Sequence, residues 1–453
     1  MKAEKKLTEY VCRTQFNEIP RDALKVMQNM LAGVFGTTIA GSGSEGCDAL
    51  VQYYLDQGGK EDATILIHGG KVPAQNAVMV NSVMARALDF DDAMAPGIHI
   101  GASVVPAALG AAELAGGCSG KEFLTALALG TEIAARLNLT EATYDGFDPT
   151  GVCSVFAATV AAGRILQLNE SEMWNALALA FNRSGGSFQC NIDGSLAVRV
   201  IQGWVSQTGM HCAQLAKLGI TGPKNFLDGV YGYFHLFGRD VVSSDACVQG
   251  LGERFDLQKV IFKKYPSCGL TLGCTDVTLA LLEENGLAPD DVDRIEVRVP
   301  PYAFKLVGHP FKIGDNPKVN AQFSIQYCVA NALLRKCSRL RHFEESAIRD
   351  PEIMAFTEKI SVTSDPELDA RGHTALDLTV FMKSGEEHLK KMNIAPGFPG
   401  NPLTQKDHEN HFWDCMDFAN TPFPKERAEE LLKTIDQVED LKDVQVLIPL
   451  LVI

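Results

Sequence analysis

The sequence lacks the motifs that mark most cofactor-dependent enzymes. It contains no CxxC pair, no Cys and His spacing typical of a zinc site, no P-loop and no GxGxxG turn. Redox and phosphoryl-transfer chemistry therefore have no recognisable machinery in this chain. We expect no metal site and no cofactor, which leaves reactions carried out by acidic and basic side chains.

Long apolar runs and an excess of positive charge are also missing. No uncharged apolar run reaches about 18 residues, and the charged N-terminus Met1–Lys6 has no apolar segment behind it. Lys and Arg number 41 against 56 Asp and Glu, which gives a formal net charge of −15. Because nucleic acids and anionic membranes require basic faces, we expect neither as a partner. The twelve scattered cysteines are typical of reduced, mostly buried thiols in a cytoplasmic protein.

An acidic stretch, Leu88–Asp92, is followed by His99 and flanked by small, apolar segments at 77–87 and 102–115. Both flanks predict buried helices, so the carboxylates are expected on a loop where helices converge. Burying carboxylates is costly unless they are paired or used, and a site that takes a proton from a carbon acid uses such groups. The alternative is a solvated helix cap, because Asp is favoured at helix starts.

Hydrophobic periodicity divides the chain into regions of different character. Apolar residues recur at helical spacing from residue 7 to 218, interrupted by a short strand expected at 63–67. From about residue 258 the pattern mixes helices at 270–284 and 320–334 with strands at 294–299 and 359–363 and a hairpin at 376–392. Beyond the Pro/Gly-rich stretch 396–402 the pattern is helical again. We predict a mainly α protein with a smaller α+β domain: an all-helical domain built from both chain ends, 1–258 and 396–453, with an α+β domain at 259–395 inserted between them.

The chain resembles the MmgE/PrpD family, which includes 2-methylcitrate dehydratase, cis-aconitate decarboxylase and iminodisuccinate epimerase. The resemblance rests on the order and spacing of five stretches: 87–92 with His99, 146–151, 263–266, 321–327 and 400–404. It implies that the α+β domain is a lid, that the active site lies in the cleft between domain and lid, and that the protein is a homodimer. The implied chemistry needs no cofactor. A proton is removed next to a carboxylate of a small anionic substrate, and then water or CO2 leaves or the proton returns on the other face.

Three residues match positions that the dehydratase and decarboxylase members use: Asp89, His99 and Lys263. Four positions depart from the family pattern. Ala93 stands where those relatives have a Thr, Asp148 and Leu272 each stand where they have a His, and Gln207 stands where they have a Lys. These positions are expected near the substrate. Without two imidazoles and one ammonium, the site is not expected to bind the same tricarboxylate in the same way.

Other candidates have weaker grounds. Tyr144 and Lys263 match the pair that the epimerase is thought to use on opposite faces of its substrate. Arg199 and Arg183 are suited to neutralising substrate carboxylates, although such residues are more often found on helix surfaces. Cys268, close to Lys263, has the alternatives of a substrate-contacting thiol or an inert core residue.

Three functions remain open from the sequence. The first is a lyase, a dehydratase or decarboxylase, acting on a small di- or tricarboxylate. The second is an epimerase or isomerase of an iminodisuccinate-like dicarboxylate, using the same proton abstraction. The third is a non-catalytic relative that binds a ligand. The lyase is placed first by analogy with the family.

Overall fold

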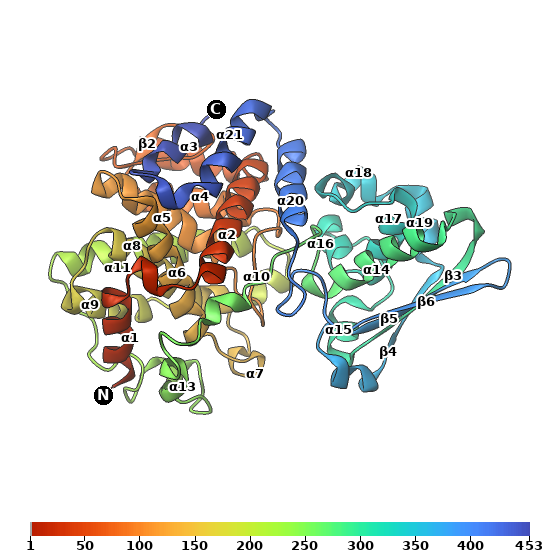
Figure 1. The fold of residues 1–453 in the computed structure, drawn as a ribbon, viewed down its shortest axis with the longest axis horizontal. Coiled ribbons are helices and arrows are strands. Elements are labelled where there is room, and N and C mark those ends of the chain that lie inside the picture. Colours follow the sequence, from red (N-terminus) through yellow and green to blue (C-terminus); the bar gives the residue numbers. More distant parts are fainter. Residues whose placement is uncertain (1) are drawn as a thin grey trace. The chain divides into compact units, whose positions relative to one another are not determined.

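The computed structural model describes residues 2–453, which divide into two compact units. The helical unit contains the described part of Met1–Val260 together with Cys415–Ile453, and the α+β unit contains Ile261–Asp414 (Figure 1). The chain leaves the α+β unit at Asp414, beyond the expected residue 395. The reason is that the first part of α20 (Gln405–Phe418) is hydrogen-bonded to the α+β unit. Asp414 accepts the backbone N–H of Leu340, and His411 Nδ1 donates to the carbonyl oxygen of Lys263.

The helical unit contains fourteen α-helices among its described residues, four of them short. Their bounds are α1 Ala3–Arg13, α2 Arg21–Gly41, α3 Cys47–Gln57, α4 Ala74–Arg86, α5 Gly101–Ala115, α6 Gly120–Leu137, α7 Glu141–Tyr144, α8 Pro149–Ile165, α9 Glu170–Phe181, α10 Gln189–Ile192, α11 Ala197–Lys217, α12 Tyr233–Leu236, α13 Ser244–Val248 and α21 Lys425–Asp436. The short strands β1 (Ala63–Thr64) and β2 (Lys71–Val72) pair antiparallel.

Small residues let the central helices of this unit approach closely. A Cβ added at Gly130 of α6 would lie 2.7 Å from the carbonyl oxygen of Ala157 on α8, and one at Gly209 of α11 would lie 2.5 Å from Cβ of Ala158. The Ala- and Gly-rich composition therefore serves helix–helix packing, as expected. α5 is buried along Gly101–Ala112. Across residues 2–453, no helix is both long and apolar enough to cross a membrane.

The C-terminal residues complete the helical unit. α21 lies beside α2, blue against red in Figure 1. Val444 donates its N–H to the carbonyl oxygen of Cys118, and Ile453 donates to that of Ile67. Residues 415–453 therefore pack with the N-terminal helices.

The α+β unit has a four-stranded sheet in the order β4-β3-β5-β6. β3 and β4 are parallel, whereas the β3–β5 and β5–β6 pairs are antiparallel, so the predicted hairpin is present. Buried side chains of β3 and β5 form one core with α14 and α17. The bounds are β3 Val292–Val299, β4 Ile360–Ser364, β5 Leu376–Met382, β6 Glu387–Met392, α14 Gly269–Asn285, α15 Pro301–Val307, α16 Pro317–Gln322, α17 Ile325–Arg335, α18 Glu345–Ile348 and α19 Pro351–Thr357.

Two expected elements differ in the structure. The helix predicted over 320–334 is two helices, because Ser324 has extended backbone and caps α17 by accepting the N–H of Tyr327. The strand predicted at 63–67 stops at Thr64, because residues 65–70 form the turn that joins β1 to β2. Gly69 donates its N–H to the carbonyl oxygen of Ile65, and Ile67 has a left-handed φ of 66°.

Candidate functional site

The acidic stretch lies on the loop between α4, which ends at Arg86, and α5, which begins at Gly101. Asp91 and His99 are buried, with exposed fractions of 1% and 8%, while Asp89 is half-buried. Asp89 has a φ of +54°, which is uncommon for a residue other than glycine. Such conformations often occur at functional sites, where the surrounding structure maintains them.

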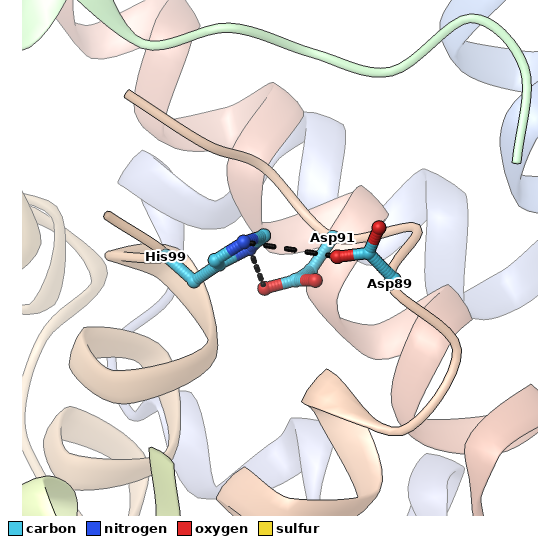
Figure 2. A group of neighbouring side chains, drawn as sticks. All are labelled: Asp89, Asp91 and His99. Atoms are coloured by element: carbon cyan, nitrogen blue, oxygen red, sulfur yellow. Dashed lines mark hydrogen bonds and ion pairs between the residues drawn. The ribbon is translucent and has the colours of Figure 1, made fainter. Parts of the chain in front are cut away.

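Asp91 and His99 form a hydrogen-bonded pair (Figure 2). The distance from Asp91 Oδ2 to His99 Nδ1 is 3.1 Å. Because a carboxylate only accepts hydrogen bonds, the shared proton is on Nδ1. In the neutral imidazole this leaves Nε2 as the basic nitrogen. It lies 3.7 Å from Asp89 Oδ1, which is too long for a direct hydrogen bond.

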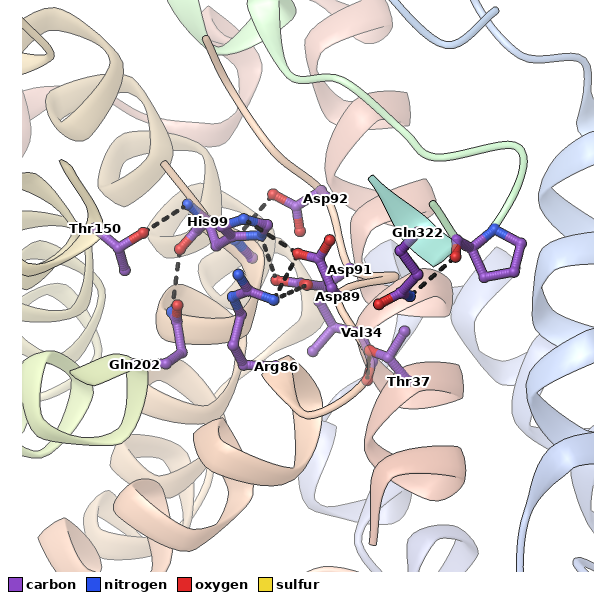
Figure 3. A network of polar contacts seen from close by, with 12 residues as sticks. Val34, Thr37, Arg86, Asp89, Asp91, Asp92, His99, Thr150, Gln202 and Gln322 are labelled. Atoms are coloured by element: carbon purple, nitrogen blue, oxygen red, sulfur yellow. Dashed lines mark hydrogen bonds and ion pairs between the residues drawn. The ribbon is translucent and has the colours of Figure 1, made fainter. Parts of the chain in front are cut away.

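Arg86, at the end of α4, contacts both carboxylates (Figure 3). Its Nη1 lies 2.7 Å from Asp89 Oδ1 and 3.8 Å from Asp91 Oδ1. Burial alone would lower the pKa of Arg86, but the charges of Asp89 and Asp91 raise it above its ordinary value. The four side chains thus contact one another and bring together one permanent cation, two carboxylates and one imidazole.

The backbone of His99 is held by side chains from two other helices. Its N–H donates to Thr150 Oγ1 at 3.1 Å, and its carbonyl oxygen accepts from Ser154 Oγ at 3.2 Å and Gln202 Nε2 at 3.0 Å. Thr150 and Ser154 are one turn apart on α8, and Gln202 is on α11. Sequence reasoning missed all three, since Ser, Thr and Gln within helices carry no distinguishing pattern.

Asp92 caps a helix start, as the alternative interpretation proposed, but it is buried and not solvated. Its Oδ2 accepts the backbone N–H of Gly101 at 3.0 Å and so satisfies a free donor at the start of α5. Capping therefore accounts for Asp92, whereas Asp91 is directed to the imidazole.

Asp89, Asp91 and His99 have the donor atoms of a metal site, each within 4.8 Å of the others. Two carboxylates and an imidazole suit a divalent cation. However, the Arg86 guanidinium contacts both carboxylates, so an ion placed among them would meet an existing positive charge. The residues present do not fit a metal well, and we assign none.

Tyr144 is unsuited to act as a base. Its side chain is buried, and its hydroxyl accepts the N–H of Leu139 and donates to Asn138 Oδ1. Burial raises the pKa of Tyr144 well above its ordinary value, which is the opposite of what a general base requires. The structure gives Tyr144 a local structural role.

The candidate binding residues of the helical unit have structural partners. Asp148 caps α8 by accepting the N–H of Gly151, and its other oxygen accepts from Asn191. Gln207 donates to side-chain oxygens of α3 and of α4. Arg199 donates to the carbonyl oxygen of Glu45, and burial lowers the pKa of its guanidinium.

The remaining candidates lie in the α+β unit. Lys263 is buried, with 5% exposed, and its carbonyl oxygen accepts from His411. Lys264 pairs with Asp276 at 2.7 Å and Asp407 at 3.5 Å. Cys268 is half-buried at the N-cap of α14, and Leu272 is fully buried in that helix. Leu272 packs there with Tyr265 and Ala395.

The chain thus combines a helical unit with an α+β unit, and the helical unit contains a buried group of two carboxylates, one arginine and one histidine. The MmgE/PrpD N-terminal domain model matches residues 5–243, and the MmgE/PrpD C-terminal domain model matches residues 265–439. The chain therefore belongs to the MmgE/PrpD family.

Curated relatives agree with this assignment. The chain is 27% identical over 397 residues to cis-aconitate decarboxylase of Homo sapiens, covering 84% of this chain and 80% of the relative. It is 23% identical over 401 residues to cis-aconitate decarboxylase of Aspergillus terreus, covering 82% and 81%. It is 22% identical over 472 residues to the cis-aconitate decarboxylase-like protein oryM of Aspergillus oryzae, covering 98% and 96%. The names of these relatives support lyase activity of the MmgE/PrpD type.

Proposed function

We propose that this protein is a cofactor-independent lyase that moves a proton at a carbon next to a carboxylate of a small di- or tricarboxylate. The observation that carries the proposal is the buried Asp91–His99 pair beside Asp89. Asp91 keeps the proton on Nδ1 of the imidazole, and Nε2 is then the atom that exchanges a proton with substrate.

The pair serves either form of elimination. In dehydration, Nε2 takes the proton from the carbon next to the carboxylate, the carbon–oxygen bond at the neighbouring carbon breaks, and the hydroxyl leaves as water after taking a proton. In decarboxylation, the carbon–carboxylate bond breaks, its electron pair stays on carbon, and the protonated imidazole delivers a proton there as CO2 leaves. Asp91 stabilises the imidazolium in both cases, because its Oδ2 lies 3.1 Å from Nδ1.

The proposal includes Lys263 as a cation that binds a substrate carboxylate. Its support is the resemblance of the Lys263–Pro266 stretch together with the burial of Lys263. Lys264, the neighbouring lysine, is engaged by two carboxylates and offers a matched control.

Replacing Lys263 by Ala is expected to lower kcat/KM by about 100-fold, the scale of losing one positioned charged donor. Lys264→Ala should have a much smaller effect, because Lys264 is already paired within its own unit. Steady-state kinetics of both variants provide the comparison, and equal activity of Lys263→Ala and wild type would remove Lys263 from the site.

A screen of C4 to C7 di- and tricarboxylates, including the cis-aconitate named for the relatives, tests the function itself. A ligand that binds the folded protein raises its Tm by mass action, and turnover is then followed as released CO2 or new alkene absorbance. We expect at least one polycarboxylate to raise Tm and to be turned over. Binding without turnover would favour the non-catalytic alternative. Inversion at carbon with no loss of mass would favour the epimerase, although Tyr144 does not fit the role of its base.

A further inference from the structure

Arg86 has a place in the site that the proposed acid–base chemistry does not explain. It belongs to the last turn of α4, and its side chain is 10% exposed. A guanidinium is expensive to remove from water, so a buried one is expected to have paired anions. The anions in direct contact with it are the carboxylate that orients His99 and the carboxylate nearest the other ring nitrogen.

The contacts form a ring of four side chains. Asp91 uses Oδ2 toward His99 Nδ1 at 3.1 Å and Oδ1 toward Arg86 at 3.8 Å. Asp89 uses the same oxygen, Oδ1, toward Arg86 at 2.7 Å and toward His99 Nε2 at 3.7 Å. The imidazole therefore has a carboxylate facing each nitrogen (Figure 2). By distance, only the contact at Nδ1 is a hydrogen bond.

This asymmetry requires a cause, because either carboxylate is able to accept the imidazole proton. Arg86 supplies one. Its short contact with Asp89 draws the shared Oδ1 toward the guanidinium and reduces the capacity of that oxygen to accept from Nε2. The longer contact with Asp91 leaves Oδ2 available to Nδ1. Two carboxylates this close would also repel each other without the cation between them.

We propose that Arg86 is a positioning residue that selects the Nδ1–H form of His99, by holding Asp89 away from Nε2 and Asp91 against Nδ1. This inference rests on the proposed function of His99 as the group that exchanges a proton through Nε2. Arg86 need not touch substrate, because its effect passes through the two carboxylates.

The direct test is the position of the proton on His99 in wild type and Arg86 variants. Protein carrying 15N-labelled histidine is examined without substrate by long-range 1H–15N NMR at about pH 8.5, two units above the usual histidine pKa. The chain has ten histidines, so the His99 signals are identified by their loss in His99→Gln. Wild type is expected to show Nδ1 protonated and Nε2 unprotonated. Arg86→Met is expected to show a mixture of both forms, and Arg86→Lys an intermediate proportion.

Arg164→Met is the control for loss of a half-buried arginine elsewhere in the helical unit. Arg164 donates to the carbonyl oxygens of Val11 and Cys12 and makes no contact with the His99 group among the described residues. This variant is expected to lose stability and to keep the wild-type His99 signals. If Arg86→Met does not fold, Arg86→Lys carries the test, because a lysine keeps the charge but not the shape of the contact.

Kinetics separate positioning from binding once a substrate is known. Arg86→Met should lower kcat by about 100-fold, the lower end of a general acid–base contribution, with a much smaller change in KM. Unchanged His99 signals in both Arg86 variants would overturn the role of Arg86. That result is distinct from a failure of the proposed function, which would appear as wild-type protein that turns over no polycarboxylate.

Discussion

At the scale of single residues, the central feature is the division of labour among neighbouring aspartates. Asp91 is bonded to the imidazole, Asp92 to the start of α5, and Asp89 to Arg86. Four residues of sequence thus contain a tautomer-fixing group, a helix cap and a charge partner. Only the first of these takes part directly in the proposed proton transfer.

Asp91→Asn separates the first role from the others. An amide keeps the shape of the carboxylate, but it neither stabilises an imidazolium nor fixes the proton on Nδ1 as strongly. We expect kcat/KM to fall by about 100-fold or more, in the range of a general acid–base contribution. Steady-state kinetics measure this effect, with Asp245→Asn, an exposed residue at the start of α13, as the control. Wild-type kcat/KM in Asp91→Asn would show that His99 does not depend on Asp91.

Gly101, the first residue of α5, and Gly97, on the loop before it, offer a matched pair. A Cβ at Gly101 would lie 1.8 Å from Asp92 Oδ1, whereas one at Gly97 would meet no atom within 4 Å. Gly101→Ala must therefore displace the cap, and the free energy of unfolding should fall by about 1–3 kcal/mol, as for overpacking elsewhere. Gly97→Ala should change it by less than about 0.5 kcal/mol, as for other substitutions away from packed features. Urea denaturation of both variants gives the comparison, and equal stabilities would contradict the capping role of Asp92.

Sequence reasoning identified those residues of the site that are close together in the chain. Asp89 and His99 stand on one loop, whose helical flanks were recognisable from their small apolar residues. Gln202 is 103 residues from the His99 carbonyl oxygen that it contacts, so only the packing of α11 against α5 and α8 brings it there. The roles of Asp91 and Asp92 also could not be separated, because adjacent aspartates have the same local propensity.

At the scale of elements, the sequence does not reveal whether a charged pair within a helix is exposed or buried. Glu132 and Arg136 are spaced as a typical exposed i, i+4 pair on α6, yet both side chains are fully buried. Arg136 donates to the carbonyl oxygens of Cys247 and Gln249, and Glu132 accepts the N–H of Leu257. The pair thus fixes the segment that follows α13, a role that depends on tertiary contacts and not on spacing.

We expect the stability of the protein to depend on pH through His342. This residue lies in the short helix η4 (Leu340–Phe343) of the α+β unit. Burial, together with the charges of Arg335 and Arg339, lowers the pKa of His342 from 6.5 to about 4. Its Nδ1 accepts the backbone N–H of Arg339, which protonation of that nitrogen would prevent. Between about pH 6.5 and pH 4 the unfolded chain binds this proton more readily than the folded one, so the free energy of unfolding falls as the pH is lowered through that window.

Replacing His342 by Gln is expected to remove this contribution, since the amide oxygen is able to accept the same N–H without titrating. Urea denaturation of wild type and His342→Gln at several pH values gives the difference in slope. The two proteins should diverge in their pH dependence between about pH 6.5 and pH 4 and run parallel above it. Parallel curves throughout the range would refute a lowered pKa for His342.

At the scale of the whole molecule, the periodicity changes from helical to alternating near residue 258, and the first segment of the helical unit ends at Val260. The Pro/Gly-rich stretch 396–402 resembles a linker, but the chain remains in the α+β unit until Asp414. Tertiary contacts, among them those of Asp407, His411 and Asp414, place the first part of α20 there. A homodimer and a cytoplasmic location remain proposals drawn from the resemblance and the composition, and sedimentation equilibrium tests the first.

The most direct test of the central claim follows the proton itself. The polycarboxylate that is turned over in the screen is incubated in deuterium oxide with wild type and with His99→Gln, and carbon-bound deuterium is measured by NMR and mass spectrometry. For a decarboxylation we predict one solvent deuterium at the carbon that lost CO2. For a dehydration, substrate deuterated next to its carboxylate should lose that deuterium to solvent. His99→Gln should slow either reaction by about 100-fold or more. Turnover with no exchange between that carbon and solvent, or equal rates for wild type and His99→Gln, would contradict the account.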